Sequence, residues 1–238
     1  MHLRIDPAIF HTFPGTLIGV VVARGIDNSG EAPEARAALR AAEASLPARF
    51  GTGPVTEHPA VAPWREAYRR FGARPKDHPS SIENLVRRVM KGQALPHINP
   101  LVDVYNTVSL LHLLPAGGEN LDALQGDLHL TFAGPDEPAV RLLGEPEARA
   151  PVAGEVIYRD DVGAVCRRWN WKEAERTKLT PATRNALLVL EALPPAGAAS
   201  LEAALADLAR GIAAACGGAF RTALLDASYP DLDLAAPE

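Results

Sequence analysis

Apolar positions along the chain recur with two periods, and the period changes near the middle of the sequence. Up to about residue 112, most apolar side chains lie three and four positions apart, the spacing of one face of an α-helix. The clearest example contains Trp64, Ala67, Tyr68 and Phe71, and Gly72 ends it. After about residue 126, short runs alternate between apolar and polar residues, as half-buried β-strands do. The pattern therefore predicts mainly helices first and strands later.

Two further helices begin with recognisable signals. Ser80 and Glu83 form a capping box, and Gly92 closes the helix that follows. Asn99 is an N-cap residue with Pro100 at the first helical position, which predicts a helix over 101–111. The side chains expected to point inward from this helix are Leu101, Tyr105, Val108 and Leu111.

The remaining predicted elements are shorter or less regular. An Ala-rich helix is expected over residues 31–46, closed by Pro47, and another over 201–216. The sequence Pro-Ala-Gly-Gly at 115–118 is expected to form a tight turn. The apolar run 185–193 fits a strand or a helix, and we favour a strand. The other expected strands cover 17–22, 127–132, 140–143, 155–159, 162–169 and 220–225.

These elements define an expected architecture. Helices grouped before strands favour an α+β domain whose sheet is mostly antiparallel or mixed. We expect a single domain over residues 1–230, in which an N-terminal layer (1–55) precedes a core (56–230) near the loop Gly51-Thr52-Gly53-Pro54. Residues 231–238 form an acidic tail that we expect to be frayed.

Composition excludes several classes of protein. The 238 residues contain no apolar run near the length of roughly 20 that crosses a bilayer. The N-terminus lacks the pattern of a signal peptide, so we expect a soluble cytoplasmic protein. Cys166 and Cys216 show no CxxC spacing, which argues against a disulfide scaffold and a zinc site. No Walker loop, GxGxxG, HExxH or GxSxG motif occurs, and we expect neither a cofactor nor a metal.

Charge is distributed unevenly along the chain. The formal net charge is −5, which by itself disfavours a nucleic-acid partner. Residues 64–92 nevertheless hold eight Lys and Arg against three acidic residues, a local charge of +5. Residues 167–184 hold six against two, a local charge of +4, so the rest of the chain carries −14. Aromatic residues lie within both basic segments, and this combination suits phosphate contacts and base stacking.

Each basic segment also has a simpler interpretation as a solvated surface. Trp64, Tyr68 and Phe71 have the spacing of core residues, so packing explains them better than base stacking. Trp169 and Trp171 share one face if their segment is extended, which leaves a surface role open to them. The charge pattern is therefore compatible with an RNA partner.

Several segments are similar to one known family. The longest reads Leu95-Pro96-His97-Ile98-Asn99-Pro100-Leu101-Val102-Asp103-Val104-Tyr105-Asn106. It resembles a segment of the editing domain in the bacterial phenylalanyl-tRNA synthetase β subunit, called the B-three/B-four (B3/4), or tRNA-binding, domain. The resemblance covers about Trp64 to Leu193. The shorter segments that carry it are Ser80-Ser81-Ile82-Glu83, Pro115-Ala116-Gly117-Gly118-Glu119-Asn120-Leu121-Asp122, Cys166-Arg167-Arg168-Trp169-Asn170 and Thr177-Lys178-Leu179-Thr180.

The resemblance implies an α/β domain that binds tRNA, and whose version in the synthetase hydrolyses tyrosine mischarged onto phenylalanine tRNA. In such proofreading, a second pocket removes a wrong amino acid that the first pocket accepted. Asn106 matches the family's pocket asparagine, and Asn99 matches the earlier asparagine of the same motif. Gly117 stands where the family has a pocket histidine, and Glu119 lies near, but out of register with, the position of a pocket glutamate. The accepted amino acid is therefore left open.

The expected site combines these positions with other polar and basic residues. Gly117 and Gly118 either offer backbone N–H groups at close approach or form a plain turn. Asparagine is a poor helix former, so Asn106 inside a helix favours a role for its amide. The expected pocket residues are Asn99, Asn106, Gly117, Gly118, Glu119 and Asn170. The side chains expected to bind tRNA are Arg65, Arg69, Arg87, Arg88, Arg167, Arg168 and Lys172.

Three functions remain open at this point. The first is a freestanding deacylase that hydrolyses a mischarged aminoacyl-tRNA in trans, which needs a held substrate, an oriented water and donors for an oxyanion. The second is a non-catalytic module that binds tRNA or an amino-acid-like ligand. The third is a small-molecule enzyme that reuses the pocket. His97 and His112 are candidate acid/base groups, although a lone histidine is more often structural.

Overall fold

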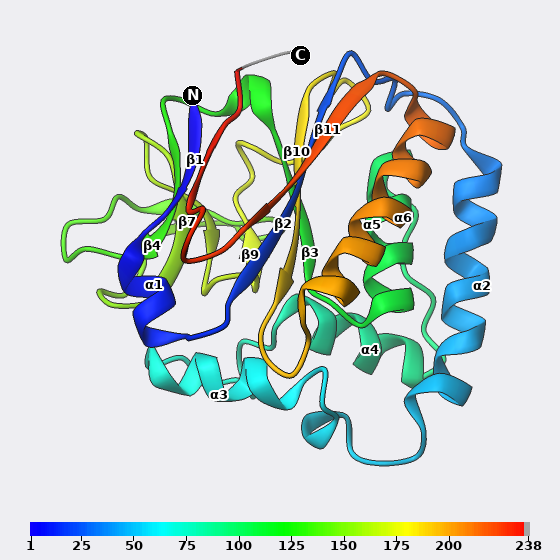
Figure 1. Ribbon diagram of the computed structural model, residues 1–238, viewed down its shortest axis with the longest axis horizontal. Helices are drawn as coiled ribbons and strands as arrows, with labels where there is room; N and C mark the ends of the chain where they lie inside the picture. The colour runs from blue at the N-terminus through cyan, green and yellow to red at the C-terminus, as the bar shows by residue number, and fades with distance from the viewer. Residues whose placement is uncertain (236–238) are drawn as a thin grey trace.

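Two β-sheets lie next to each other, and helices flank one of them and close one end (Figure 1). The computed structural model describes residues 1–235. The strands of the six-stranded sheet are, in spatial order, β12 (Asp231–Asp233), β1 (His2–Ile5), β4 (Leu128–Phe132), β7 (Val156–Arg159), β8 (Ala164–Arg167) and β9 (Lys172–Glu173). Those of the four-stranded sheet are β11 (Ala219–Leu225), β2 (Leu17–Arg24), β10 (Ala186–Ala192) and β3 (Ala116–Asn120). A separate ribbon pairs β5 (Val140–Arg141) with β6 (Ala148–Arg149).

The pairing confirms the expected α+β class with antiparallel and mixed sheets. The four-stranded sheet is antiparallel throughout. In the six-stranded sheet only β1 and β4 run parallel, and their neighbours are antiparallel. The strand predicted over 185–193 is β10, which pairs with β2 on one side and β3 on the other.

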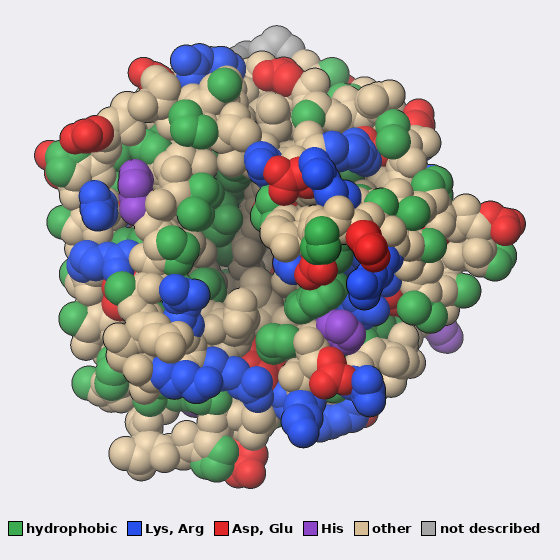
Figure 2. All heavy atoms as spheres, turned by 180° about the vertical axis from the view of Figure 1, so that it is seen from behind, with side chains coloured by type: hydrophobic (Ala, Val, Ile, Leu, Met, Phe, Trp, Pro, Cys, Tyr) green, Lys and Arg blue, Asp and Glu red, His purple; other side chains and the backbone are tan. Residues whose placement is uncertain are grey.

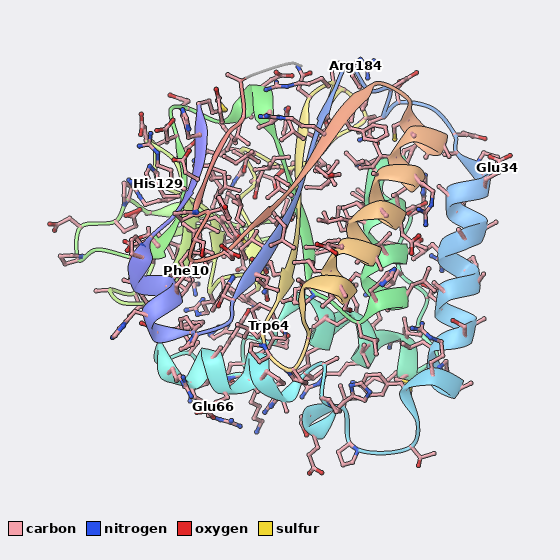
Figure 3. All side chains as sticks on the ribbon, viewed as in Figure 1. Phe10, Glu34, Trp64, Glu66, His129 and Arg184 are labelled. Atoms are coloured by element: carbon pink, nitrogen blue, oxygen red, sulfur yellow. The ribbon has the colours of Figure 1, made fainter. Side chains whose placement is uncertain are left out.

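The described chain also contains six α-helices and two short 3₁₀ turns. They are α1 (Pro7–Thr12), α2 (Pro33–Phe50), α3 (Ala62–Arg70), α4 (Ser81–Met90), α5 (Pro100–His112), α6 (Ala198–Cys216), η1 (Val55–Glu57) and η2 (Leu121–Ala123). Helices α5 and α6 pack on the four-stranded sheet, and α2 packs outside α5 (Figure 1). On α3, Trp64 points toward the sheets and Glu66 points away from them (Figure 3). Within residues 1–235, no helix combines the length and apolar character needed to span a bilayer.

The expected helix signals have the predicted geometry. The Ser80 hydroxyl accepts the Glu83 N–H (3.4 Å), and the Asn99 side chain accepts the Val102 N–H (3.0 Å). Gly72 and Gly92 end α3 and α4 with φ of 82° and 72°, a region that favours glycine.

One side chain of the predicted inward face points outward instead. Leu111 is 39% exposed and borders a surface groove between α2, α5 and α6, together with Thr107 and Val108.

The predicted turn over 115–118 is wrong, because most of it belongs to strand β3. A Cβ atom on Gly118 would lie 2.4 Å from Leu188 Cδ1, so a glycine here lets the strand approach its neighbour. The end of α2 also differs from the prediction, since Pro47 lies inside the helix. Phe50 is buried and holds the last turn against the core, and Gly51 (φ 81°) then ends the helix.

Residues 1–55 do not form a layer of their own. β1 lies inside the six-stranded sheet between β12 and β4, and β2 lies inside the four-stranded sheet between β11 and β10. The expected frayed tail is also corrected at its start, because β12 pairs with β1 and Leu234 is buried. The last three residues of that expected tail, 236–238, lie outside the described residues.

Candidate ligand-binding pocket

A cavity of about 300 Å³ lies where the edge strands of the two sheets face each other. Its walls come from β3 and β10 of one sheet, from the neighbourhood of β7, β8 and β9 of the other, and from α4 and α5. Five of the six pocket residues expected from the sequence line it: Asn106, Gly117, Gly118, Glu119 and Asn170.

Strand alternation explains how these residues reach the same cavity. Along β10, Leu187, Val189 and Glu191 point to the cavity side, since successive side chains of a strand alternate between faces. On β3, Gly117 lies opposite Val189 and Glu119 lies opposite Leu187 in the ladder, so they share that side.

Asn99, the sixth expected pocket residue, has a structural role instead. Its Oδ1 accepts the Val102 N–H, and its Nδ2 donates to the Leu179 carbonyl (3.3 Å). The side chain is buried and does not line the cavity. Two turns later in α5, Asn106 lines the cavity, and its carboxamide makes no hydrogen bond to the rest of residues 1–235.

The hairpin between β8 and β9 delivers Asn170 to the cavity. Arg168 and Trp169 both have left-handed backbone conformations (φ 48° and 64°), which cost a residue with a side chain about 1–2 kcal/mol each. Trp169 is fully buried, whereas Trp171 is half-buried with the Arg168 guanidinium 4.7 Å from its ring centre. The segment that holds the two tryptophans is not extended, so the condition under which they would share one face is not met.

Glu191 anchors this hairpin from the four-stranded sheet. Its Oε1 accepts the Tyr158 hydroxyl (2.6 Å) and the Trp169 indole N–H (2.9 Å), and its Oε2 accepts the Asn170 side-chain N–H (2.5 Å). Burial raises the pKa of Glu191 to about 7, although the three hydrogen bonds act in the opposite direction. The Asn170 Oδ1 accepts the Tyr68 hydroxyl (2.9 Å), so both ends of this carboxamide are engaged.

Two more carboxylates line the cavity. Glu119 on β3 is buried, and its Oε2 has no hydrogen-bond partner among the described residues. Glu173 on β9 accepts the Gly118 N–H (3.2 Å), which joins the edge strands of the two sheets. Burial raises the pKa of Glu119 well above its usual range, and the neighbouring Glu173 carboxylate adds to this effect. Burial also raises the pKa of Glu173 to about 7.

Sequence reasoning missed Glu173 and Glu191. Glu191 did carry a signal, because it is a charged residue inside the apolar run 185–193. No sequence signal indicated Glu173, because an acidic residue among basic ones is typical of a surface ion pair. Cys166 also lines the cavity, but burial raises the pKa of its thiol well above the usual value, so the reactive thiolate is disfavoured.

The basic side chains of α3 and α4 are partly engaged in ion pairs. Arg65 and Arg87 each contact Glu83 Oε1 at 2.6 Å. Arg69 pairs with Glu66 at 3.3 Å on the surface. Arg88 is exposed and donates to the Ala94 carbonyl (3.0 Å).

The basic side chains of the β8–β9 hairpin differ in exposure. Arg167 is buried and contacts both Glu155 oxygens (2.7 and 3.0 Å), so the expectation that it binds tRNA is wrong. Arg168 lies 3.7 Å from the same carboxylate, and Lys172 pairs with Glu145 at 2.5 Å. Seen from behind, the surface is hollowed near its middle, and Lys and Arg side chains gather beside and below the hollow (Figure 2).

The two candidate acid/base histidines lie away from the cavity lining. His97 Nδ1 is 2.6 Å from Asp103 Oδ2, and His112 Nε2 is 2.7 Å from Asp207 Oδ2. Among residues 1–235, no group of three or more His, Cys, Asp or Glu is arranged to hold a metal ion.

Comparison with known proteins identifies one family. The sequence matches the family described as B3/4 domain over residues 63–210. Among solved structures, it is similar to an N-terminal fragment of the phenylalanyl-tRNA synthetase β-subunit from Pyrococcus horikoshii, at 10% sequence identity and a TM-score of 0.47. That match covers 92% of this chain and 50% of the other, so this chain spans half the length of that fragment. A comparison with curated proteins finds no match.

Proposed function

This chain belongs to the B3/4 domain family, and on that premise we propose that it binds the aminoacyl end of a tRNA and hydrolyses the aminoacyl ester in trans. The observation that carries the proposal is the cavity, which gathers Asn106, Glu119 and Asn170 beside Trp171 and Lys172. A pocket of about 300 Å³ suits one amino-acid side chain and its ester carbonyl.

The rim offers contacts for the terminal nucleotides of a tRNA. Trp171 is half-buried, with the Arg168 guanidinium and the Lys172 ammonium 4.7 and 5.7 Å from its ring centre. Asn84 lines the cavity from α4, and Arg88 follows one turn later on the same exposed face. Aromatic and basic groups together bind single-stranded nucleic acid by stacking and phosphate contacts.

Ester hydrolysis requires a donor for the oxygen that becomes negatively charged. The Gly118 N–H already donates to Glu173, which leaves it unsuited to this role. Both ends of the Asn170 carboxamide are engaged as well. The Asn106 carboxamide is unengaged and faces the cavity, so we assign it to the ester carbonyl.

A second candidate, a module that binds an amino-acid-like ligand without acting on it, is favoured by a specific observation. Six of the seven cations expected to bind tRNA lie within 4 Å of a carboxylate of the same chain. Ion pairs of this kind reduce the positive potential that would attract a phosphate backbone.

Incubation with a panel of mischarged aminoacyl-tRNAs tests the proposal, with release of free amino acid as the measurement. We expect at least one pair to be hydrolysed, and we expect Asn106→Ala to lower kcat/KM for that pair at least tenfold while leaving thermal unfolding unchanged. Asn185→Ala is the matched control, because Asn185 bonds Asp122 on the surface.

The outcomes separate the two candidates. Hydrolysis of no pair would contradict the deacylase. Tight binding of aminoacyl-tRNA or amino acid with an intact ester would favour the binding module. If Asn106→Ala and Asn185→Ala were equally active, the role given to Asn106 would be wrong.

A further inference from the structure

We propose that Glu119 and Glu173 form a recognition site for a primary ammonium group of the ligand. The inference rests on the proposed function, because it names the group by which the pocket holds an aminoacyl moiety. The group is a primary ammonium, and it can be either the α-amine or a side-chain amine of the ligand.

The first observation is the state of the Glu119 carboxylate. The residue is only 7% exposed, lines the cavity, and has one oxygen without a hydrogen-bond partner in direct contact among residues 1–235; the buried Thr177 hydroxyl, which also lacks a partner there, is near enough to lower the pKa of Glu119. A buried carboxylate oxygen that lacks a donor is costly, and native proteins seldom retain one without a use. Glu191 in the same cavity shows the contrast, since three donors satisfy its two oxygens.

The second observation is that the nearby cations are engaged with other acids. Lys172 contacts Glu145 at 2.5 Å, and the Arg176 guanidinium contacts both oxygens of the buried Asp160 (2.5 and 2.9 Å). The ion pairs within the described chain include neither Glu119 nor Glu173. A ligand that carries a positive charge would supply the counter-charge that the described chain does not place in contact with this pair.

The surroundings favour an ammonium group over other ligand groups. Three carboxylates line the cavity, which repels a phosphate or a second carboxylate. The described residues hold no group of three or more side chains placed for a metal ion. The lining aromatic residues Tyr105, Tyr158 and Trp171 can add cation–π attraction, and an ammonium supplies three N–H donors to carboxylate oxygens on opposite walls.

The two possible sources of the amine differ in their pH dependence. Glu173 must lose its proton to hold a cation, and burial raises its pKa to about 7, while burial raises the pKa of Glu119 well above its usual range; affinity should therefore rise as Glu173 ionises with increasing pH. An α-amine loses its charge near pH 8, which gives a bell-shaped profile, whereas a lysine-type amine stays charged to about pH 10. The titratable and charged groups around the pair are Tyr105, Tyr158, Asp160, Cys166, Arg176 and Glu191.

Calorimetric titration with small probes tests the proposal. L-leucinamide carries an α-ammonium, Nα-acetyl-L-lysinamide carries a side-chain ammonium, and N-acetyl-L-leucinamide is the neutral counterpart of the first. We expect at least one charged probe to bind at least tenfold tighter than the neutral probe at pH 7.5. Glu119→Gln and Glu173→Gln should each weaken that binding at least tenfold, while Glu175→Gln, which alters a carboxylate that pairs with Lys178 outside the cavity lining, should not.

Other outcomes would overturn the inference. Equal binding of charged and neutral probes, binding of neither, or charged-probe binding that survives both Gln variants would each contradict it. Mg²⁺, Ca²⁺ or Zn²⁺ binding that requires both glutamates and excludes the amine would also contradict it. Near-ultraviolet circular dichroism of each variant establishes that the fold is retained, and either Gln variant alone suffices for the comparison with Glu175→Gln.

Parallel deacylation assays separate the inference from the proposed function. If Glu119→Gln and Glu173→Gln hydrolyse a mischarged tRNA with the wild-type KM, the amine site is wrong and the deacylase stands. If the charged probes bind as expected but no aminoacyl-tRNA is hydrolysed, the deacylase is wrong and the amine site stands.

Discussion

The two faces of the four-stranded sheet are built from the same strands but differ in chemistry. On the helix side, Leu188 and Leu190 of β10 pack with the apolar residues of α5 and α6. On the side that faces the second sheet, Leu187, Val189 and Glu191 border a cavity that also holds Glu119 and Glu173. Neighbouring residues of β10 therefore have different roles: those on the helix side stabilise the fold, and those on the other side line the pocket.

The difference lies in how polar groups are satisfied. The core on the helix side is built mainly from apolar side chains, and the buried polar residues Asn28 and Ser109 are hydrogen-bonded to backbone groups there. The other face keeps three carboxylates, of which Glu191 is fully hydrogen-bonded and Glu119 is not. Burial of carboxylates costs free energy, so the cavity side contributes less to the stability of the fold than the helix side does.

The largest expected effect comes from adjacent substitutions on β10. Leu188→Ala removes a fully buried side chain from the helix side and should lower the free energy of unfolding by roughly 3–4 kcal/mol. Val189→Ala, on the cavity side, should cost roughly 1 kcal/mol or less, because its side chain borders open space. Urea unfolding of both variants measures the difference. Equal losses would contradict the division of the sheet into a packed face and a pocket face.

The next effect is a dependence of stability on pH. The pKa of Glu191 is about 7 in the folded protein and near 4.5 when unfolded, so folding is most favoured below the unfolded value. This contribution is lost as pH rises from about 4.5 through about 7. The Glu191→Gln variant has no carboxyl group to ionise at this position. Between pH 5 and 8, its free energy of unfolding should therefore fall by on the order of 2–3 kcal/mol less than that of the wild type.

Urea unfolding at several pH values measures this profile. Glu175→Gln serves as the control, because its surface carboxylate pairs with Lys178 and should leave the wild-type slope in place. Parallel profiles for wild type and Glu191→Gln would show that this carboxylate is not held in its protonated form by burial.

The smallest effect is expected at the rim of the pocket. Arg88→Ala should weaken tRNA binding a few-fold and lower the slope of log affinity against log salt by about 1, because one exposed cation is removed. Arg210→Ala on α6, on the helix side of the sheet, is the matched control and should leave both quantities unchanged. Filter binding at several salt concentrations measures both. Equal behaviour of the two variants would place the nucleic-acid contact elsewhere.

Local signals account for the elements that the sequence predicts well. Helix α3 has apolar spacing and a terminal glycine, α4 has an N-cap and a terminal glycine, and α5 has an N-cap followed by proline, each within one short segment; β10 has a long apolar run. Strand β3 could not be predicted in this way, because its two glycines suggest a turn and only contact with Leu188 explains them. The pairing of β1 with β12 depends on residues from opposite ends of the chain, which no local pattern reports.

The site was predictable where a motif carries it. The family resemblance pointed to Asn99, Asn106 and Gly117, and of these Asn106 and Gly117 line the cavity. Glu173 reaches the pocket only because the hairpin turns back on itself at Arg168 and Trp169, and nothing in its own sequence neighbourhood indicates that turn. Conversely, Arg167 looked like a surface cation because its partner Glu155 lies twelve residues away, on the approach to a neighbouring strand.

The hydrogen bond from Gly118 to Glu173 connects the edges of two sheets, so a cation held beside it would add a second link between them. A ligand that binds only the folded chain adds RT ln(1 + [L]/Kd) to its stability, about 2.7 kcal/mol at a hundred times Kd. Ligand binding and folding are then thermodynamically linked, so a higher ligand concentration increases the folded fraction of the protein. In a cell, where unfolded chains are degraded, the abundance of this protein would follow the supply of its own ligand.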